Sequence, residues 1–241
     1  MIKPEYKELL DAGVHFGHLK KKWNPKMSPY IFMERKGIHI IDLNRTIDCM
    51  EKAAAGLKQI ARSGRKILFV ATKRQARDIV AQAALSVDMP FVTDRWLGGM
   101  MTNFATIRRS VKKMNDIDRM LAEPENYVFT KKERLTLTRE RNKLERVLGG
   151  VAKLNRIPSA MFIVDISHEH IALDEAHKLG MRTFGVVDTN SDPNKVDYPI
   201  PGNDDASKSI SILTQYAINA IKEGLAEREQ NKAEKQATQK G

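Results

Sequence analysis

Short apolar runs alternate along the chain with longer amphipathic stretches. The runs rich in β-branched residues lie at residues 38–43, 66–71, 91–93, 160–166 and 183–189. Continuous apolar runs of this length are typical of strands that are buried on both faces. Three stretches between them keep the three-to-four-residue spacing of one helix face. They are Ile47, Met50, Ala54, Leu57 and Ala61, then Ala76, Ile79, Val80, Ala83 and Val87, and finally Ile171, Ala172, Glu175, Ala176 and Leu179.

This alternation of strands and helices predicts the fold class. Parallel neighbouring strands need a crossover of a dozen or more residues, which is usually a helix. We therefore expect an α/β protein with a doubly wound, largely parallel sheet of the Rossmann or flavodoxin type.

Residues 102–156 interrupt this alternation. Two apolar seams at helical spacing flank a polar turn around EPENYVFT, residues 123–130. The seams are Phe104, Ile107, Val111, Met114, Ile117 and Leu121, then Leu137, Leu144, Leu148 and Val151. The pattern predicts an inserted antiparallel coiled-coil helical hairpin over 102–156, between the two parts of a discontinuous α/β domain, 1–101 and 157–226. Residues 227–241 are expected to form a disordered basic and polar tail or a fraying helix end.

The charge of the chain favours polyanionic partners. The formal net charge is +11 at pH 7, and each Lys or Arg placed against a phosphate releases condensed counterion. No apolar run approaches the roughly 20 residues that span a bilayer, so we expect a soluble cytoplasmic protein with no membrane partner. The single cysteine, Cys49, leaves no disulfide framework and no multi-cysteine zinc site.

The sequence carries no recognisable catalytic motif. No strand is followed by a glycine-rich phosphate loop, and the strand-end acids Asp165 and Asp188 lack a nucleophile and base at a recognisable spacing. We therefore expect a protein that is not an enzyme and needs no cofactor and no small-molecule substrate. The alternative from another class is a sheet-domain enzyme or regulator that binds a phosphorylated small ligand.

Basic and aromatic residues are interleaved in residues 18–37, where Pro25 and Pro29 disfavour a helix. Cations hold phosphates and exposed rings stack on bases, so this segment is suited to irregular RNA. Trp23 and Phe32 are expected to pin the segment to the core. The basic residues are Lys20, Lys21, Lys22, Lys26, Arg35 and Lys36. A second basic surface is expected on the outer face of the hairpin, at Arg108, Arg109, Lys112 and Lys113.

A possible metal site involves loops at the carboxyl edge of the sheet. There Asp188, Asp204 and Asp205 are expected to converge with His15 or His18, as ligands of a structural Mg²⁺ or Zn²⁺. The interpretation that we favour is simpler: Asp204 and Asp205 begin the last helix and cap its free N–H groups.

Several strings in the expected order resemble bacterial small-subunit ribosomal protein two. They are AGVHFGH (12–18), WNPKM (23–27), GIHIIDL (37–43), KILFVATKRQA (66–76), RWLGGMMTNF (95–104), DTNSDP (188–193) and IPGNDDA (200–206). The resemblance covers nearly the whole chain, and departs from the family mainly at the hairpin tip and the tail.

The resemblance implies a ribosomal location, with attachment to 16S rRNA between the head and body of the small subunit. It also implies contact with other small-subunit proteins and a role in tethering ribosomal protein one for translation initiation. The matching motifs place further rRNA contacts at Trp23, Asn24, Lys26, Lys73, Arg74, Arg95 and Trp96.

Overall fold

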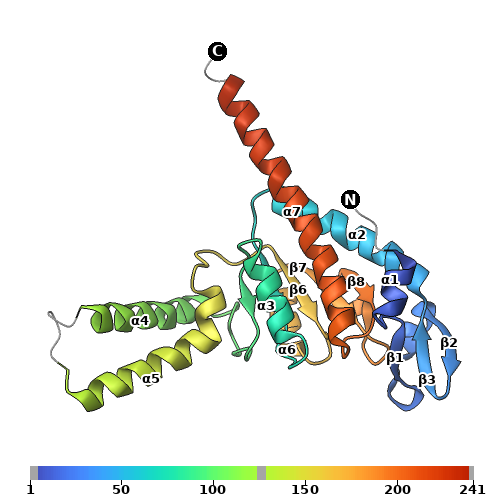
Figure 1. Ribbon diagram of the computed structural model, residues 1–241, viewed down its shortest axis with the longest axis horizontal. Helices are drawn as coiled ribbons and strands as arrows, with labels where there is room; N and C mark the ends of the chain where they lie inside the picture. Colours follow the sequence, from blue (N-terminus) through green and yellow to red (C-terminus); the bar gives the residue numbers. More distant parts are fainter. Residues whose placement is uncertain (1–4, 124–128, 239–241) are drawn as a thin grey trace.

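A five-stranded sheet forms the centre of the protein, as the computed structural model of residues 5–123 and 129–238 shows (Figure 1). The strand order is β5-β4-β6-β7-β8, and every neighbouring pair is parallel. The strands are β4 (Ile67–Val70), β5 (Phe91–Val92), β6 (Ala160–Val164), β7 (Arg182–Val187) and β8 (Tyr198–Pro201). The predicted parallel sheet is therefore confirmed.

Helices cover both faces of this sheet. On one face, Ile67 and Phe69 of β4 belong to a core shared with α2 (Leu43–Arg62), α3 (Arg77–Leu85) and α7 (Ser207–Thr238). The alternate residues Leu68 and Val70 face a second core shared with α6 (His170–Lys178) and the start of the hairpin. Burial on both faces explains why the strands appear in the sequence as continuous apolar runs.

Helices α2 and α7 pack closely over one face of the sheet. The two helices come close at Gly224, where an added Cβ would clash with the Lys58 carbonyl oxygen. Glycine is therefore required at this crossing. Glu227 reaches Lys58 and Arg62, with N–O distances of 2.7 and 3.7 Å. Helix α7 continues to Thr238, so the tail predicted at 227–241 is helical as far as 238.

The run at residues 38–43 was predicted to join the parallel sheet, and this prediction is wrong. Its strand β3 (Ile38–Ile41) lies at the centre of a separate antiparallel sheet of order β1-β3-β2. The other two strands are β1 (Phe16–Leu19) and β2 (Ile31–Arg35). The two-residue turn at Lys36 and Gly37 has positive φ values of 53° and 78°, as in a tight hairpin that returns the chain antiparallel.

The segment between β1 and β2, predicted to be an extended loop, folds into the short 3-10 helices η1 (Lys20–Lys22) and η2 (Pro25–Tyr30). Helix α1 (Tyr6–Asp11) precedes this small sheet.

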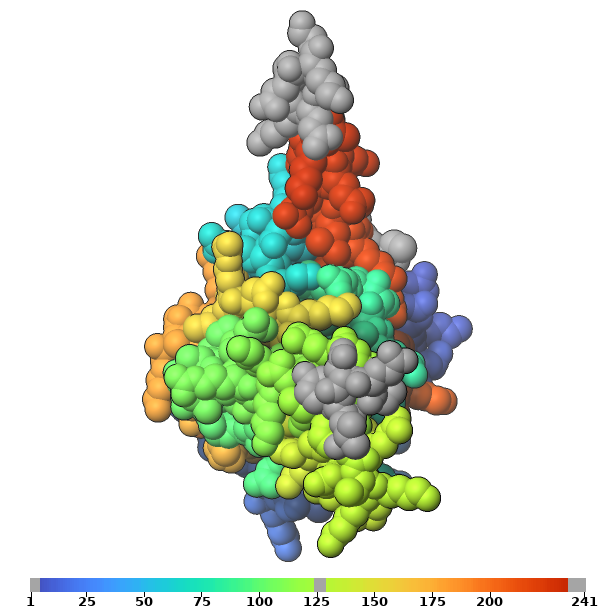
Figure 2. Space-filling view, turned by 90° about the vertical axis from the view of Figure 1, so that its left-hand side faces the viewer, coloured from blue at the N-terminus to red at the C-terminus, as the bar shows by residue number. Residues whose placement is uncertain are grey.

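Helices α4 (Phe104–Ala122) and α5 (Lys131–Leu148) lie between β5 and β6 in the chain. They project from one end of the α/β domain, while the small sheet lies at the opposite end (Figure 1). Ile107, Val111, Met114 and Ile117 of the predicted seam are buried. Of the turn predicted at EPENYVFT, residues 124–128 lie outside the described residues. Figure 2 views the molecule from the hairpin end, with α4 and α5 side by side in front of the sheet domain.

The short helices η3 (Gly149–Val151) and η4 (Pro193–Lys195) complete the fold. Among the described helices, none combines the length and the apolar character that crossing a membrane requires.

Candidate nucleic-acid interface

Exposed lysines follow β1 in η1. Lys20 is held by Glu34, with Nζ 2.6 Å from Oε2, and Lys26 is held by Asp192 at the same distance from Oδ2. Lys21 and Lys22 are exposed and form no ion pair with any residue in 5–123 or 129–238. Lys20 and Lys26 are thus held by carboxylates, whereas Lys21 and Lys22 are not paired in this way, although the charge of Lys22 helps to lower the pKa of Asp205.

The aromatic and amide residues of this segment also differ in whether contacts with the rest of the protein hold them. Trp23 is partly buried, with its ring centroid 5.0 Å from that of His39. Asn24 donates its backbone N–H to the Thr189 carbonyl over 2.7 Å and accepts from the Lys26 N–H, so it holds the loop in place. Phe32 is 70% exposed. The expectation that Phe32 pins the segment to the core is wrong, because β2 lies at the edge of the small sheet and turns this ring outward.

The outer face of the small sheet is also apolar. In the strand register, Ile40 lies between Phe16 and Met33, and Ile38 lies between Leu19 and Arg35. Phe16, Met33 and Leu19 are all exposed, and Arg35 lies beside them. We call these residues, Phe16, Leu19, Met33, Arg35, Ile38 and Ile40, the outer face.

A cavity of about 460 Å³ opens at the carboxyl ends of β4 and β6. The strand order reverses at β4, which has β5 on one side and β6 on the other, and ligands of doubly wound sheets bind at such points. Asp94 lies between two arginines here, 3.4 Å from Arg77 Nη1 and 3.0 Å from Arg146 Nε. Arg95 lines the same cavity and is exposed, as is Arg74 in the loop after β4.

Trp96 was predicted to contact rRNA, but the structure gives it an internal role. It is buried, and its indole N–H donates to Glu175 Oε1 over 3.0 Å. The same carboxylate accepts from the backbone N–H groups of Gly99, Met101 and Thr102 and from the Thr102 hydroxyl, over 2.7 to 3.1 Å. Burial alone would raise the pKa of Glu175, but these hydrogen bonds outweigh it and lower the pKa. Glu175 thus fixes residues 96–102 against α6.

The sequence itself contains a signal for this role. Glu175 stands on the apolar face of its helix, between Ala172 and Ala176, where a carboxylate is expected only if buried donors surround it.

On the hairpin, three of the four predicted basic side chains point outward. Arg109, Lys112 and Lys113 are exposed on α4, and Lys113 forms an ion pair with Glu140 of α5. Arg108 instead donates to the carbonyls of Ala152 and Leu154, over 3.4 and 2.8 Å. It therefore braces the base of the hairpin.

Lys73 was also predicted to contact rRNA, but its ammonium group lies among carboxylates. Its Nζ is 3.1 Å from Asp165, 2.7 Å from Asp204 and 2.6 Å from Asp205, and its side chain is only 16% exposed. Burial lowers the pKa of Lys73, but hydrogen bonds to Asp204 and Asp205 and the charge of Asp165 outweigh it and raise the pKa. This lysine neutralises the acidic loops and is not directed toward a ligand outside.

The acidic residues of the predicted metal site do converge. His18 Nδ1 lies 3.0 Å from Asp188 Oδ2, and His18 Nε2 lies 3.5 Å from Asp205 Oδ2. Ligand atoms of His18, Asp188 and Asp204 all lie within 4.8 Å of one another. Asp204 is fully buried, and its Oδ2 has no hydrogen-bond partner among the described residues. Burial and the charges of Asp165 and Asp188 raise the pKa of Asp204 to about 7.

Of the two histidines that were alternatives for this cluster, His18 belongs to the converging group. The His15 ring lies tilted against Phe16, with centroids 4.0 Å apart. Burial lowers the pKa of His15. Asp204 and Asp205 do not cap α7 with their side chains, because both bind Lys73. Asn203 Oδ1 accepts the N–H groups of residues 205 and 206, which precede the helix.

Comparison with known proteins gives one consistent result. The profile of the family described as Ribosomal protein S2 matches residues 9–224. A small ribosomal subunit protein uS2 from Cytophaga hutchinsonii is 60% identical over 230 residues, which are 95% of this chain and 91% of that protein. The uS2 protein of Bacteroides fragilis is 53% identical, over 98% of this chain and 85% of its own length. That of Christiangramia forsetii is 58% identical, over 94% of this chain and 76% of its own length.

The match covers the small sheet, the parallel sheet and the hairpin inserted between β5 and β6. The resemblance drawn from the sequence motifs is therefore confirmed. This chain therefore belongs to the ribosomal protein S2 family, whose members are structural and non-enzymatic components of the ribosome.

Proposed function

We propose that this protein is a structural constituent of the small ribosomal subunit that binds 16S rRNA between head and body. The observation that carries the proposal is the presence of outward-facing cations at both ends of the molecule. At one end, η1 carries the exposed Lys21 and Lys22 and the neighbouring strand β2 carries the exposed Phe32, and at the other end Arg109 and Lys112 lie on α4. Cations with an exposed ring are suited to phosphates and an unstacked base.

Arg35, Arg74 and Arg95 extend this basic surface, and all three are exposed. Lys20, Trp23, Asn24 and Lys26 lie in the same segment as Lys21 and Lys22 and would shape the loop that meets the RNA. The distance between the two ends favours contact with separate rRNA elements, which is what a site between head and body requires.

The hairpin is proposed to act as an antiparallel coiled-coil arm. Its buried residues on α4 recur at three- and four-residue steps, as a coiled-coil seam does. Arg141 Nε bonds Asp118 Oδ1 over 2.7 Å across the two helices.

The outer face of the small sheet is proposed to bind protein, and in particular to help tether ribosomal protein one. Its exposed apolar residues, Phe16, Leu19 and Met33, form the kind of patch that marks a protein contact. Arg35 lies at its edge and could meet an acidic group of the partner.

The cluster of His18, Asp188 and Asp204 is proposed to hold a structural Zn²⁺ or Mg²⁺. Its support is the gathered nitrogen and oxygen atoms and the buried Asp204 Oδ2 without a partner. Such an ion would stabilise the loops at the carboxyl edge of the sheet and would supply no catalysis.

Filter binding to naked 16S rRNA over a range of salt concentrations tests the rRNA proposal. K21Q/K22Q should weaken binding and reduce the logarithmic salt slope by about 0.7 to 0.9 for each phosphate that these lysines neutralise. K20Q/K26Q is the matched control, because it removes the same charge from lysines that carboxylates already hold. Equal effects of the two double variants, or an unchanged slope in K21Q/K22Q, would show that these lysines do not contact RNA.

A hairpin deletion tests the arm. Removing residues 105–147 and joining the ends with a short glycine linker should leave a folded α/β domain that enters small subunits less well, as measured by sedimentation. Normal incorporation of the deletion variant would refute the role of the arm.

A further inference from the structure

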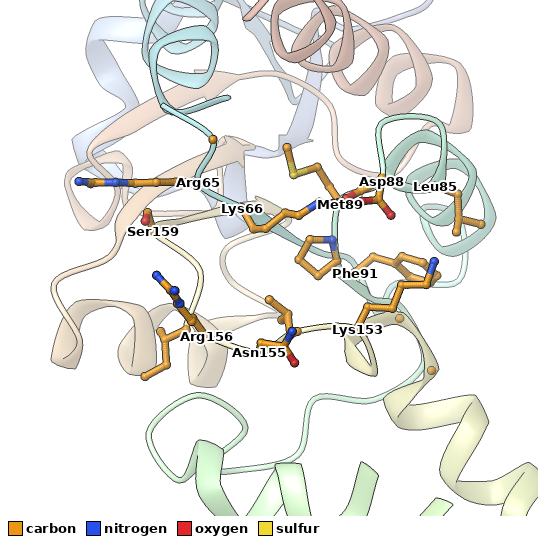
Figure 3. Close-up of a pocket in the computed structure, with 16 residues that line it drawn as sticks. Arg65, Lys66, Leu85, Asp88, Met89, Phe91, Lys153, Asn155, Arg156 and Ser159 are labelled. Atoms are coloured by element: carbon orange, nitrogen blue, oxygen red, sulfur yellow. Dashed lines mark hydrogen bonds and ion pairs between the residues drawn. The ribbon is translucent and has the colours of Figure 1, made fainter. Parts of the chain in front are cut away.

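A second basic cavity lies at the opposite edge of the parallel sheet, where β4, β5 and β6 begin. It has a volume of about 530 Å³ and is closed on one side by residues 149–157, which follow α5. In Figure 3, Arg65 and Ser159 lie on one side of it, and Phe91 and Lys153 lie on the other. It shares no residue with the cavity beside Asp94.

The charges around this cavity are strongly unbalanced. Four basic side chains line it, namely Arg65, Lys66, Lys153 and Arg156, against the single acid Asp88. Lys66 occupies that carboxylate, with Nζ 2.8 Å from Oδ2, and lowers the pKa of Asp88. Arg65, Lys153 and Arg156 are exposed and form no ion pair within the part of the chain that the structure describes. The cavity therefore favours an anionic occupant.

Apolar side chains form the rest of the cavity lining. Met89 and Leu154 are buried in its floor, and the Phe91 ring lies partly open to it. At its rim Leu85 is 65% exposed and Ile157 is 42% exposed. Its volume falls in the range of roughly 300 to 1,000 Å³ that holds a compact ligand. An occupant thus needs a flat or apolar body as well as a negative charge.

We propose that this cavity receives one unpaired nucleotide of the bound RNA. The base would lie on the apolar floor near Phe91, and the flanking phosphates would meet Lys153 and Arg156. Unstacked bases are recognised on aromatic rings and on the planes of arginine side chains, with phosphates held by cations. An acidic peptide shares the charge but has no planar base to place against the Phe91 ring.

The position of the cavity supports this assignment. Residues 149–157 lead directly from α5 into the cavity wall, so the cavity adjoins the base of the hairpin that is proposed to bind the same RNA. The inference rests on the proposed rRNA binding and adds a site for a single base to it.

The test uses the full chain and a single-stranded RNA heptamer with 2-aminopurine at its centre, followed by fluorescence. The wild type should bind it and change its fluorescence, and an abasic heptamer should bind roughly five- to a hundredfold more weakly, because the stacked base is lost. K153Q/R156Q and, separately, Leu85→Ala should weaken binding of the 2-aminopurine heptamer and reduce the fluorescence change. K7Q/K208Q loses the same charge from exposed lysines outside the cavity and should behave as the wild type.

The arms of this experiment distinguish the possible occupants. Adenosine monophosphate that binds as tightly as the heptamer would assign the cavity to a free nucleotide and overturn the RNA inference. Equal binding of the abasic and intact heptamers, or wild-type binding by K153Q/R156Q, would overturn it too. An acidic amphipathic peptide that binds there while the heptamer does not would assign the cavity to protein.

Filter binding of the wild type to 16S rRNA, measured in parallel, separates the two levels of the proposal. If the wild type binds 16S rRNA but does not bind the intact heptamer more tightly than the abasic one, only the nucleotide site is refuted. If the wild type does not bind 16S rRNA, the proposed function is refuted, and the nucleotide site with it. Thermal unfolding of each variant serves as the check on folding, and exposed substitutions of this kind should leave it unchanged.

Discussion

Replacing Glu175 with glutamine would remove one of two carboxylate oxygens that together accept five hydrogen bonds. Oε1 accepts from Trp96 and Gly99, and Oε2 accepts from Met101 and from the N–H and hydroxyl of Thr102. The glutamine side chain has the same shape but only one oxygen, so its NH₂ group must face at least two donors, one of which is buried, either the Trp96 indole N–H or the Met101 N–H.

The expected loss follows from those donors. A buried N–H left without an acceptor costs about 1–3 kcal/mol, so Glu175→Gln should lower the free energy of unfolding by at least about 1–3 kcal/mol. Urea unfolding at pH 7, followed by circular dichroism, measures this loss. Glu229→Gln on the exposed surface of α7 is the control and should change the stability by less than about 0.5 kcal/mol.

The pH dependence gives this prediction a second test. Hydrogen bonding lowers the pKa of Glu175, so its carboxylate stabilises the fold above the unfolded pKa of about 4.3. That contribution is lost as the pH falls through the lower folded pKa. The gap between wild type and Glu175→Gln should therefore be full at pH 7 and should narrow in acid. A loss below about 1 kcal/mol, or a gap that does not vary with pH, would refute the reasoning.

Three further perturbations have defined outcomes. Gly150→Ala places a Cβ 2.2 Å from the Phe91 carbonyl oxygen and should destabilise the protein by about 1–3 kcal/mol in urea unfolding. Gly98→Ala, where a Cβ meets nothing within 4 Å, should cost much less, and equal losses would contradict the packing argument. Lys73→Met leaves buried carboxylates unpaired and should cost about 3–5 kcal/mol at pH 7. EDTA should lower the midpoint of thermal unfolding of the protein, and added Zn²⁺ or Mg²⁺ should restore it. If neither EDTA nor added metal changes this midpoint, no ion is bound at the cluster.

The strands at 66–71, 160–166 and 183–189 could be predicted because burial on both faces leaves an unmistakable apolar run. Strand β8 was missed because YPIP contains two prolines, which usually argue against a strand. It is tolerated here because β8 is the edge of the sheet and needs only one set of hydrogen bonds. Strand β3 was placed in the wrong sheet because an apolar run does not reveal its pairing partner.

The direction in which a basic side chain points could not be predicted from its neighbours in the chain. Lys73 and Arg74 are adjacent, yet Lys73 meets Asp204, 131 positions away, while Arg74 is exposed. Lys21 and Lys26 differ in their availability to an anion for the same reason, since Asp192 forms an ion pair with Lys26 and not with Lys21. Composition indicates that the surface carries cations for an anionic partner, but long-range contacts decide which of them are available.

The insertion of α4 and α5 between β5 and β6 affects the order in which the chain can fold. Of the strands in the parallel sheet, β4 and β5 are synthesised first. Strand β6, which must lie between β4 and β7, follows only after the whole hairpin. The two helices contact each other locally, so they can pair before β6 exists. Once paired, they hold the chain after β5 close to the chain before β6, and the entropy lost in joining β4 to β6 is that of a short loop. A nascent chain that ends just after Leu148 would therefore have a folded hairpin attached to a parallel sheet that still lacks β6, β7 and β8.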